Sequence, residues 1–196
     1  MPSEERPGRL SGAVRKELLD LARLAIRTFL EEGRRLRKGV DFGPVAPEPR
    51  GAFVTLTTAS GDLRGCIGTI LPLAPLDETV ARMAVSAAAE DPRFPPVSSR
   101  ELDGLHLDIS ALTVPEPVTD PALIEVGRHG LIVTRGHRKG LLLPQVPTEW
   151  GWDREEFLGH TCRKAGLPSD AWREPGTVIE WFEAEVWGEK DGVLAP

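Results

Sequence analysis

The stretch Leu63-Arg64-Gly65-Cys66-Ile67-Gly68 decides the fold, because it predicts a β-strand that carries unusual chemistry. Alternate side chains of a strand share a face, so Arg64 and Cys66 are expected to point the same way. The thiol therefore has a cation beside it. Gly65 and Gly68 leave backbone uncovered, where a ligand could approach closely. All four residues are candidates for a functional site.

Length and composition describe an ordinary globular protein. The chain has 196 residues, of which 40% are hydrophobic and 28% charged, and this size fits one domain with a smaller subdomain. Its net charge of −6 argues against nucleic acid as a partner. No stretch is long enough to span a bilayer, and the first residues lack the order of a signal peptide. With only two cysteines, far apart, we expect a cytoplasmic protein without disulfides.

Hydrophobic periodicity and turn residues predict the elements in order. We expect residues 1–12 to be frayed, residues 13–190 to form a single domain with a smaller internal subdomain, and residues 191–196 to be a tail. The expected elements are a helix over 14–36 that stops near Gly39, a hairpin of 51–59 with 63–71, a helix over 78–89 capped by Asp77, a strand over 104–113, a hairpin of 131–134 with 141–143, a helix from Asp153 to about Ala165, and a strand over 177–186.

Five motifs in this order resemble the AMMECR domain family. They are Leu-Arg-Gly-Cys-Ile-Gly at 63–68, Asp-Pro-Arg-Phe-Pro-Pro-Val at 91–97, His-Leu-Asp-Ile-Ser at 106–110, Gly-Arg-His-Gly-Leu-Ile-Val at 127–133 and Leu-Leu-Pro-Gln-Val at 142–146. The resemblance runs from the first helix to Trp187. It implies an α+β fold: an antiparallel β-sheet flanked by helices, with a smaller subdomain and a cleft between them, near the signature strand.

The same resemblance implies function only coarsely. Bacterial and archaeal members of the family carry the name AmmeMemoRadiSam system protein A, after a gene neighbourhood shared with Memo-type and radical-SAM proteins. A Memo-type or radical-SAM protein is therefore an expected partner. The family transfers no settled activity and no cofactor, and its likenesses to nucleotide-, nucleic-acid- and peptide-binding modules are analogies of fold.

Cys66 has two interpretations. A cation on the same face can stabilise a thiolate, so Cys66 is a candidate catalytic nucleophile. Cysteine catalysis also needs a base, and no histidine stands at a recognisable spacing. The alternative is a small buried residue packed against the first helix, since free cysteine is among the most buried residue types.

Arg64 and Arg93 are the stronger ligand-binding candidates, because a guanidinium fork suits phosphate or carboxylate. Each could instead be tied to an acidic neighbour such as Asp62, Glu90 or Asp91. Phe94 of the same loop is a further ligand-binding candidate. Gln145 either lines the cleft or caps loose backbone, and its place in a family motif favours the cleft.

Metal binding is not predicted. His160 and Cys162 stand two apart on an expected helix and diverge, and Cys162 fits the buried stripe of that helix. The five tryptophans are either an aromatic platform or core residues.

Two functions follow from these observations. We favour a binding or accessory module that recognises a small ligand, a nucleotide or a partner protein. The alternative is a cysteine-dependent enzyme that uses Cys66 with Arg64 on a small anionic or carbonyl substrate.

Overall fold

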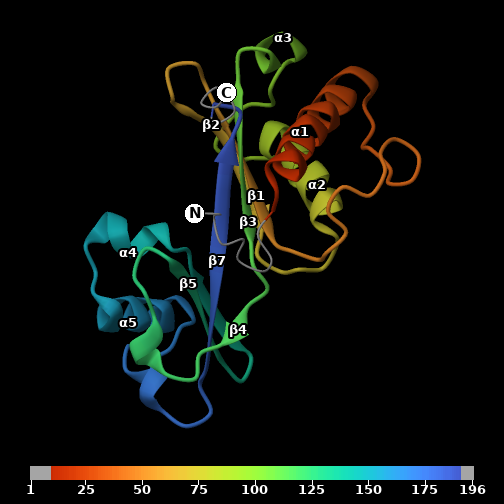
Figure 1. Cartoon of the computed structure of the whole chain (residues 1–196). Coiled ribbons are helices and arrows are strands. Elements are labelled where there is room, and N and C mark those ends of the chain that lie inside the picture. The colour runs from red at the N-terminus through yellow and green to blue at the C-terminus, as the bar shows by residue number, and fades with distance from the viewer. Residues whose placement is uncertain (1–9, 191–196) are drawn as a thin grey trace, which may run out of the picture. The chain divides into compact units, whose positions relative to one another are not determined.

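The computed structural model describes residues 10–190 and divides the chain into two compact units (Figure 1). Of the described residues, 10–112 and 185–190 belong to unit 1 and 113–184 to unit 2. The expected tail and most of the expected frayed N-terminus lie outside the described residues. The last strand, β7 (Val178–Gly188), begins in unit 2 and ends in unit 1.

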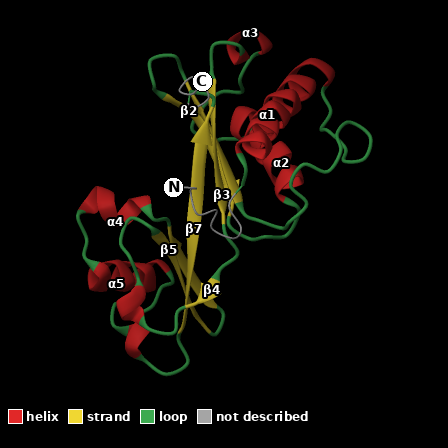
Figure 2. Cartoon of the chain, in the orientation of Figure 1, coloured by secondary structure: helices red, strands yellow, loops and turns green. Residues whose placement is uncertain are grey.

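Unit 1 is a sheet with helices on one face (Figure 2). Strand β1 pairs antiparallel with β2 on one side and with β3 on the other. The two longer helices of the unit pack against each other, and the second covers β1 and β2. The elements are α1 (Gly12–Glu32), β1 (Ala52–Thr57), β2 (Leu63–Thr69), α2 (Leu76–Ala89), α3 (Ser99–Leu102) and β3 (His106–Leu112).

The alternation of side chains gives this sheet a buried face and a polar face. Val54, Leu56, Leu107 and Ile109 are fully buried in a core shared with α1 and α2. The residues between them in sequence are half-buried and mostly polar. Within the described residues of unit 1, the helices therefore cover one face of this sheet, and the other face carries mostly polar strand residues.

Local signals set the bounds of α1. The Ser11 side chain accepts a hydrogen bond from the Val14 amide, and Gly33 ends the helix with a left-handed φ of 68°. The expected helix over 14–36 is therefore corrected at its C-terminal end to Glu32. The expected end was too late because the amphipathic pattern of the sequence continues past Gly33, whereas the left-handed backbone of Gly33 ends the helix.

The N-terminus of α2 also differs from the expectation. The helix begins at Leu76 after Pro75, so Asp77 lies in the first turn and is not the cap. Its fully buried carboxylate accepts hydrogen bonds from the Val45 and Ala46 amides and from the Lys38 ammonium. Asp77 thus ties the proline-rich segment before β1 to the helix.

Unit 2 contains a second antiparallel ladder in which β5 pairs with β6 and with β7, and β4 pairs with β7. Its main helix packs on β5 and β6 around Phe157, Leu158 and Cys162. The elements are β4 (Glu116–Pro117), η1 (Pro121–Leu123), β5 (His129–Arg135), β6 (Arg138–Leu142), α4 (Gln145–Trp150), α5 (Arg154–Lys164) and η2 (Ala171–Arg173).

The expected hairpin of unit 2 and the expected helix after Asp153 are both present. The Asp153 side chain accepts from the Glu156 amide and the Glu156 side chain accepts from the Asp153 amide, which makes a capping box. Two short helices, α3 and α4, were not expected, because each follows prolines and is too short to show periodicity.

The fold class is α+β, with antiparallel strands in the order β2-β1-β3-β7-β5-β6 and flanking helices. Among residues 10–190, no helix combines the length and the hydropathy that crossing a membrane requires.

Candidate functional site

The signature strand β2 separates its side chains as a strand should. Gly65 is buried against α2, where an added Cβ would lie 2.2 Å from the Ala87 carbonyl oxygen. Arg64 and Cys66 flank Gly65 in sequence, so their side chains point to the polar face, away from α2. Both are half-buried.

The loop after α2 covers the outer edge of β2 at Cys66. The Cys66 amide donates to Asp91 Oδ2 at 2.8 Å, and Arg93 Nη2 donates to the Cys66 carbonyl oxygen at 3.3 Å. Because β2 is an edge strand, these two side chains take the place of a neighbouring strand. Asp91 thus accepts from the amide of Cys66, and Arg93 donates to its carbonyl oxygen.

Arg93 and Asp91 form a forked pair. Arg93 Nε and Nη2 donate to the two carboxylate oxygens of Asp91 at 2.9 and 2.7 Å. The Arg93 guanidinium holds the pKa of the Asp91 carboxyl far below its usual range, and the hydrogen bond from the Cys66 amide lowers it further. Arg93 was expected either to contact a ligand or to pair with an acidic neighbour such as Asp91. The structure contains the pair with Asp91.

Arg64 is also paired, but with a residue that the sequence did not indicate. Its Nε and Nη2 donate to the two oxygens of Glu101 in α3 at 2.5 and 3.1 Å. These bonds lower the pKa of Glu101. The remaining nitrogen, Nη1, is buried and has no hydrogen-bond partner among the described residues. A buried donor without an acceptor is costly, by about 1–3 kcal/mol.

Phe94 brings the two arginines together. The Arg93 guanidinium carbon lies 5.4 Å and that of Arg64 6.0 Å from the centre of its ring. Both distances fall within cation–π range. Six residues of unit 1 thus form one group, which we call the signature cluster: Arg64, Cys66, Asp91, Arg93, Phe94 and Glu101.

The thiol of Cys66 has a hydroxyl for a neighbour. Thr55, directly opposite on β1, donates from Oγ1 to Cys66 Sγ at 3.3 Å. No hydrogen bond within the described residues joins the thiol to a histidine or a carboxylate. Asp108 lies on the same rung but two strands away, roughly 10 Å at the usual strand spacing.

The two signature glycines contact parts of the same unit. Gly65 admits the α2 backbone, and at Gly68 an added Cβ would lie 2.3 Å from the Phe53 ring. These close approaches explain both glycines by packing. Ligand contact at either one stays a prediction.

Gln145 lies in unit 2, where it is the exposed first residue of α4. Its carbonyl oxygen accepts from the Thr148 hydroxyl at 2.9 Å. The expectation that Gln145 shares a cleft with the signature strand stays a prediction.

Other chemically interesting side chains of unit 2 have structural surroundings. His129, expected in a turn, instead begins β5, where it is buried 4.5 Å from the Trp181 ring, and burial lowers its pKa. Cys162 is fully buried, and burial raises the pKa of its thiol. Within residues 10–190, no group of three potential ligands could hold a metal ion.

Comparisons with known proteins agree on one family. The AMMECR1 family model matches residues 19–187. A protein of Thermococcus gammatolerans is 50% identical over 182 residues, covering 88% of this chain and 89% of its own. One of Methanothermobacter thermautotrophicus is 48% identical over 180 residues, covering 89% and 93%.

A solved structure extends the likeness to the fold. The crystal structure of protein PH0010 from Pyrococcus horikoshii superposes with a TM-score of 0.76 at 44% identity, over 92% of this chain and 94% of that one. The sequence match and the structural match therefore cover the same nearly complete chain. This chain belongs to the AMMECR1 family.

Proposed function

We propose that this protein is a binding module whose signature cluster holds a small ligand through an acceptor oxygen, such as that of a carboxylate or a phosphate. The observation that carries the proposal is the buried Nη1 of Arg64, for which residues 10–190 supply no acceptor. A ligand oxygen that displaces the atoms covering this nitrogen satisfies the donor, while Nε and Nη2 of Arg64 keep their bonds to Glu101. Phe94 offers the same ligand an apolar ring.

The charge balance of the signature cluster limits the strength of binding. Arg64 and Arg93 are opposed by Glu101 and Asp91, so the four side chains sum to zero charge. The ligand is therefore selected by directed hydrogen bonds rather than by a net positive field. We expect modest affinity and a defined shape preference.

Cys66 in this proposal contacts the ligand and does not attack it. Its hydrogen-bonding neighbour is the Thr55 hydroxyl, which is no general base. One observation favours the alternative of a cysteine-dependent enzyme. The Arg93 guanidinium donates to the Cys66 carbonyl oxygen at 3.3 Å, so a cation lies beside the thiol residue.

An accessory role beside a Memo-type or radical-SAM protein is part of the proposal. Its support is membership of the family together with the gene neighbourhood for which bacterial and archaeal members are named. Binding of a purified Memo-type protein, measured by light scattering, tests this part separately from the ligand.

Substitution of Arg64→Lys tests the ligand site most directly. Lysine keeps a cation for Glu101 and removes Nη1, so the fold is retained while the unpaired donor is lost. Arg100→Lys, on the same short helix as Glu101 and exposed, is the matched control. The readouts are small molecules released from the purified protein on denaturation, identified by mass spectrometry, and the shift of melting temperature with acetate or inorganic phosphate.

The proposal expects the wild type and Arg100→Lys to respond alike, and Arg64→Lys to lose the response. Equal responses from Arg64→Lys and the wild type refute the ligand site. Loss in Cys66→Ser, together with rapid alkylation of Cys66 by iodoacetamide below pH 7, favours the enzyme instead.

A further inference from the structure

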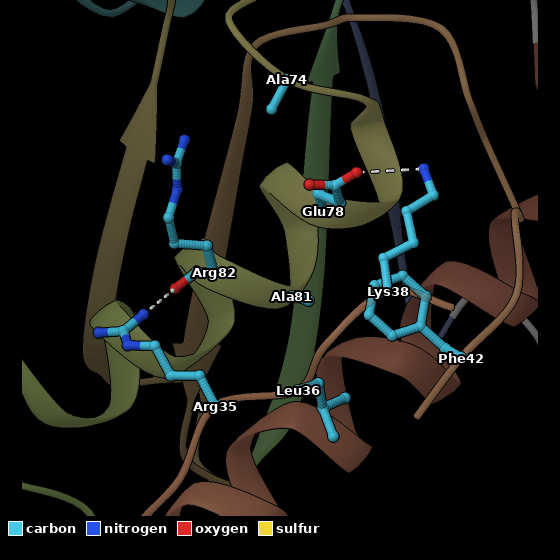
Figure 3. A pocket seen from close by; sticks show the side chains of 8 residues that line it. All are labelled: Arg35, Leu36, Lys38, Phe42, Ala74, Glu78, Ala81 and Arg82. Carbon is cyan, nitrogen blue, oxygen red and sulfur yellow. Dashed lines mark hydrogen bonds and ion pairs between the residues drawn. The ribbon is translucent and has the colours of Figure 1, made fainter. Parts of the chain in front are cut away.

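A pocket of about 210 Å³ lies beside α2, at the segment that follows α1 (Figure 3). Its walls come from that segment, from the turn before α2 and from the exposed flank of α2. The lining residues are Arg35, Leu36, Lys38, Phe42, Ala74, Glu78, Ala81 and Arg82.

Three cations and one carboxylate line this pocket, in a chain whose net charge is −6. Lys38 is engaged by Asp77 at 2.9 Å and by Glu78 at 3.3 Å. Arg35 donates to Glu90 at 2.5 Å. Arg82 takes part in these contacts only through its backbone carbonyl oxygen, which accepts a hydrogen bond from the Arg35 guanidinium at 3.4 Å.

The guanidinium of Arg82 therefore stands apart among the lining cations. It is exposed, and no ion pair joins it to a carboxylate within residues 10–190. In Figure 3 it extends toward the side of Ala74, away from Arg35, Leu36 and Phe42, whereas a dashed line joins Lys38 to Glu78. A surface ion pair such as Arg35 with Glu90 stabilises the fold by only about 0–1 kcal/mol. Arg35 can therefore exchange Glu90 for an anion that binds in the pocket.

The floor of the pocket is apolar. Leu36 and Phe42 are half-buried and pack against a small core of Leu21, Ala25, Ala81 and Val85. The pocket thus joins an apolar surface to one guanidinium that makes no ion pair within residues 10–190, while Asp77, Glu78 and Glu90 balance the three cations overall. Its volume is below the roughly 300–1,000 Å³ of most ligand pockets, which limits the occupant to a small molecule.

We propose that this pocket binds a small organic monoanion, with its carboxylate at Arg82, whose exposed side chain can turn into the pocket, and its apolar body on Leu36, Phe42 and Ala81. The site is independent of the signature cluster. Helix α2 packs on the sheet face that carries Gly65, whereas Arg64 and Cys66 point to the opposite face.

Benzoate is the probe, because it combines one negative charge with a flat apolar body. Acetate supplies the charge without the body, and benzyl alcohol supplies the body without the charge. Each is titrated into the ¹⁵N-labelled full chain, and the dissociation constant is taken from amide chemical shifts. Arg82→Gln removes the unpaired charge, Arg82→Lys restores it, and Arg100→Gln is an exposed control with the same change of charge.

The expected result is that benzoate shifts the amides of Phe42, Ala81 and Arg82 and binds more tightly than acetate or benzyl alcohol. Arg82→Gln should raise its dissociation constant at least tenfold, while Arg82→Lys and Arg100→Gln stay within about twofold. Arg64→Lys should leave benzoate binding unchanged, which separates this site from the signature cluster. Equal affinity in Arg82→Gln and the wild type, equal affinity for acetate, or shifts confined to the signature cluster overturn the proposal.

Discussion

Replacing Gly65 by alanine tests whether the signature glycine exists for packing or for ligand access. The added Cβ would lie 2.2 Å from the Ala87 carbonyl oxygen and 3.1 Å from the Ala87 carbonyl carbon. Both are backbone atoms of α2, so no side-chain rotation relieves the clash. The helix must retreat by roughly 1 Å, because protein interiors leave no spare room.

That retreat separates α2 from the sheet over fully buried residues such as Val80 and Ala84. Overpacking of this kind costs about 1–3 kcal/mol, against which the smaller entropy of unfolded alanine returns under about 1 kcal/mol. For a chain of this length, each kcal/mol lowers the melting temperature by about 2–4 °C. The net loss of up to about 3 kcal/mol therefore predicts that Gly65→Ala melts below the wild type, by up to about 12 °C.

Differential scanning calorimetry measures this shift, with Gly43→Ala as the matched control. Nothing lies within 4 Å of a Cβ built at Gly43, and its φ lies outside the positive range. An unchanged melting temperature in Gly65→Ala refutes the close approach of strand and helix. If the ligand response of the wild type is lost at the same time, Gly65 serves ligand access instead.

Three further predictions concern buried charges and the two thiols. The pKa of Asp91 is lowered in the folded protein, so its carboxylate stabilises the fold above its unfolded pKa of about 3.9, and this contribution fades as the pH falls. In urea titrations from pH 7 to pH 3, Asp91→Asn should therefore lose less unfolding free energy than the wild type. Equal losses in the two proteins would contradict the pairing. Asp77→Asn should cost about 1–3 kcal/mol and open the segment before β1 to limited proteolysis near Lys38, because a fully buried acceptor of four donors loses its charge. Iodoacetamide should label half-buried Cys66 in the native protein but reach fully buried Cys162 only in denaturant. Peptide mass mapping shows the order in which the two thiols are labelled. Labelling of Cys162 in the native protein would contradict its place in the core of unit 2.

Much of the fold could be predicted because its signals are local. The alternation of β-branched residues over 51–59 and the turn at Gly61 produced the β1–β2 hairpin as expected. Asp153 capped α5 as expected. The errors were local too: Gly33 ended α1 four residues before the expected position, and α4 was too short to show a period.

The candidate site was predictable in its members but not in its contacts. Adjacent motifs named Arg64, Cys66, Arg93 and Phe94, and the structure brings these four together in unit 1. The partner of Arg64 was missed, since Glu101 lies 37 residues away in a helix too short to recognise. A serine three residues before this glutamate, in a capping-box pattern, is the signal that could have located it.

By itself, the sequence determined which residues share a strand face, because the two-residue period of a strand is a property of local backbone geometry. Only the tertiary structure decided what those residues meet. Asp91 accepts from the Cys66 amide, and Glu101 accepts from two of the three guanidinium nitrogens of Arg64. In the part of the chain that the structure describes, the third nitrogen has no acceptor and Arg82 makes no ion pair beside the apolar floor of its pocket. Such pairings depend on how distant elements pack, and no local rule specifies them.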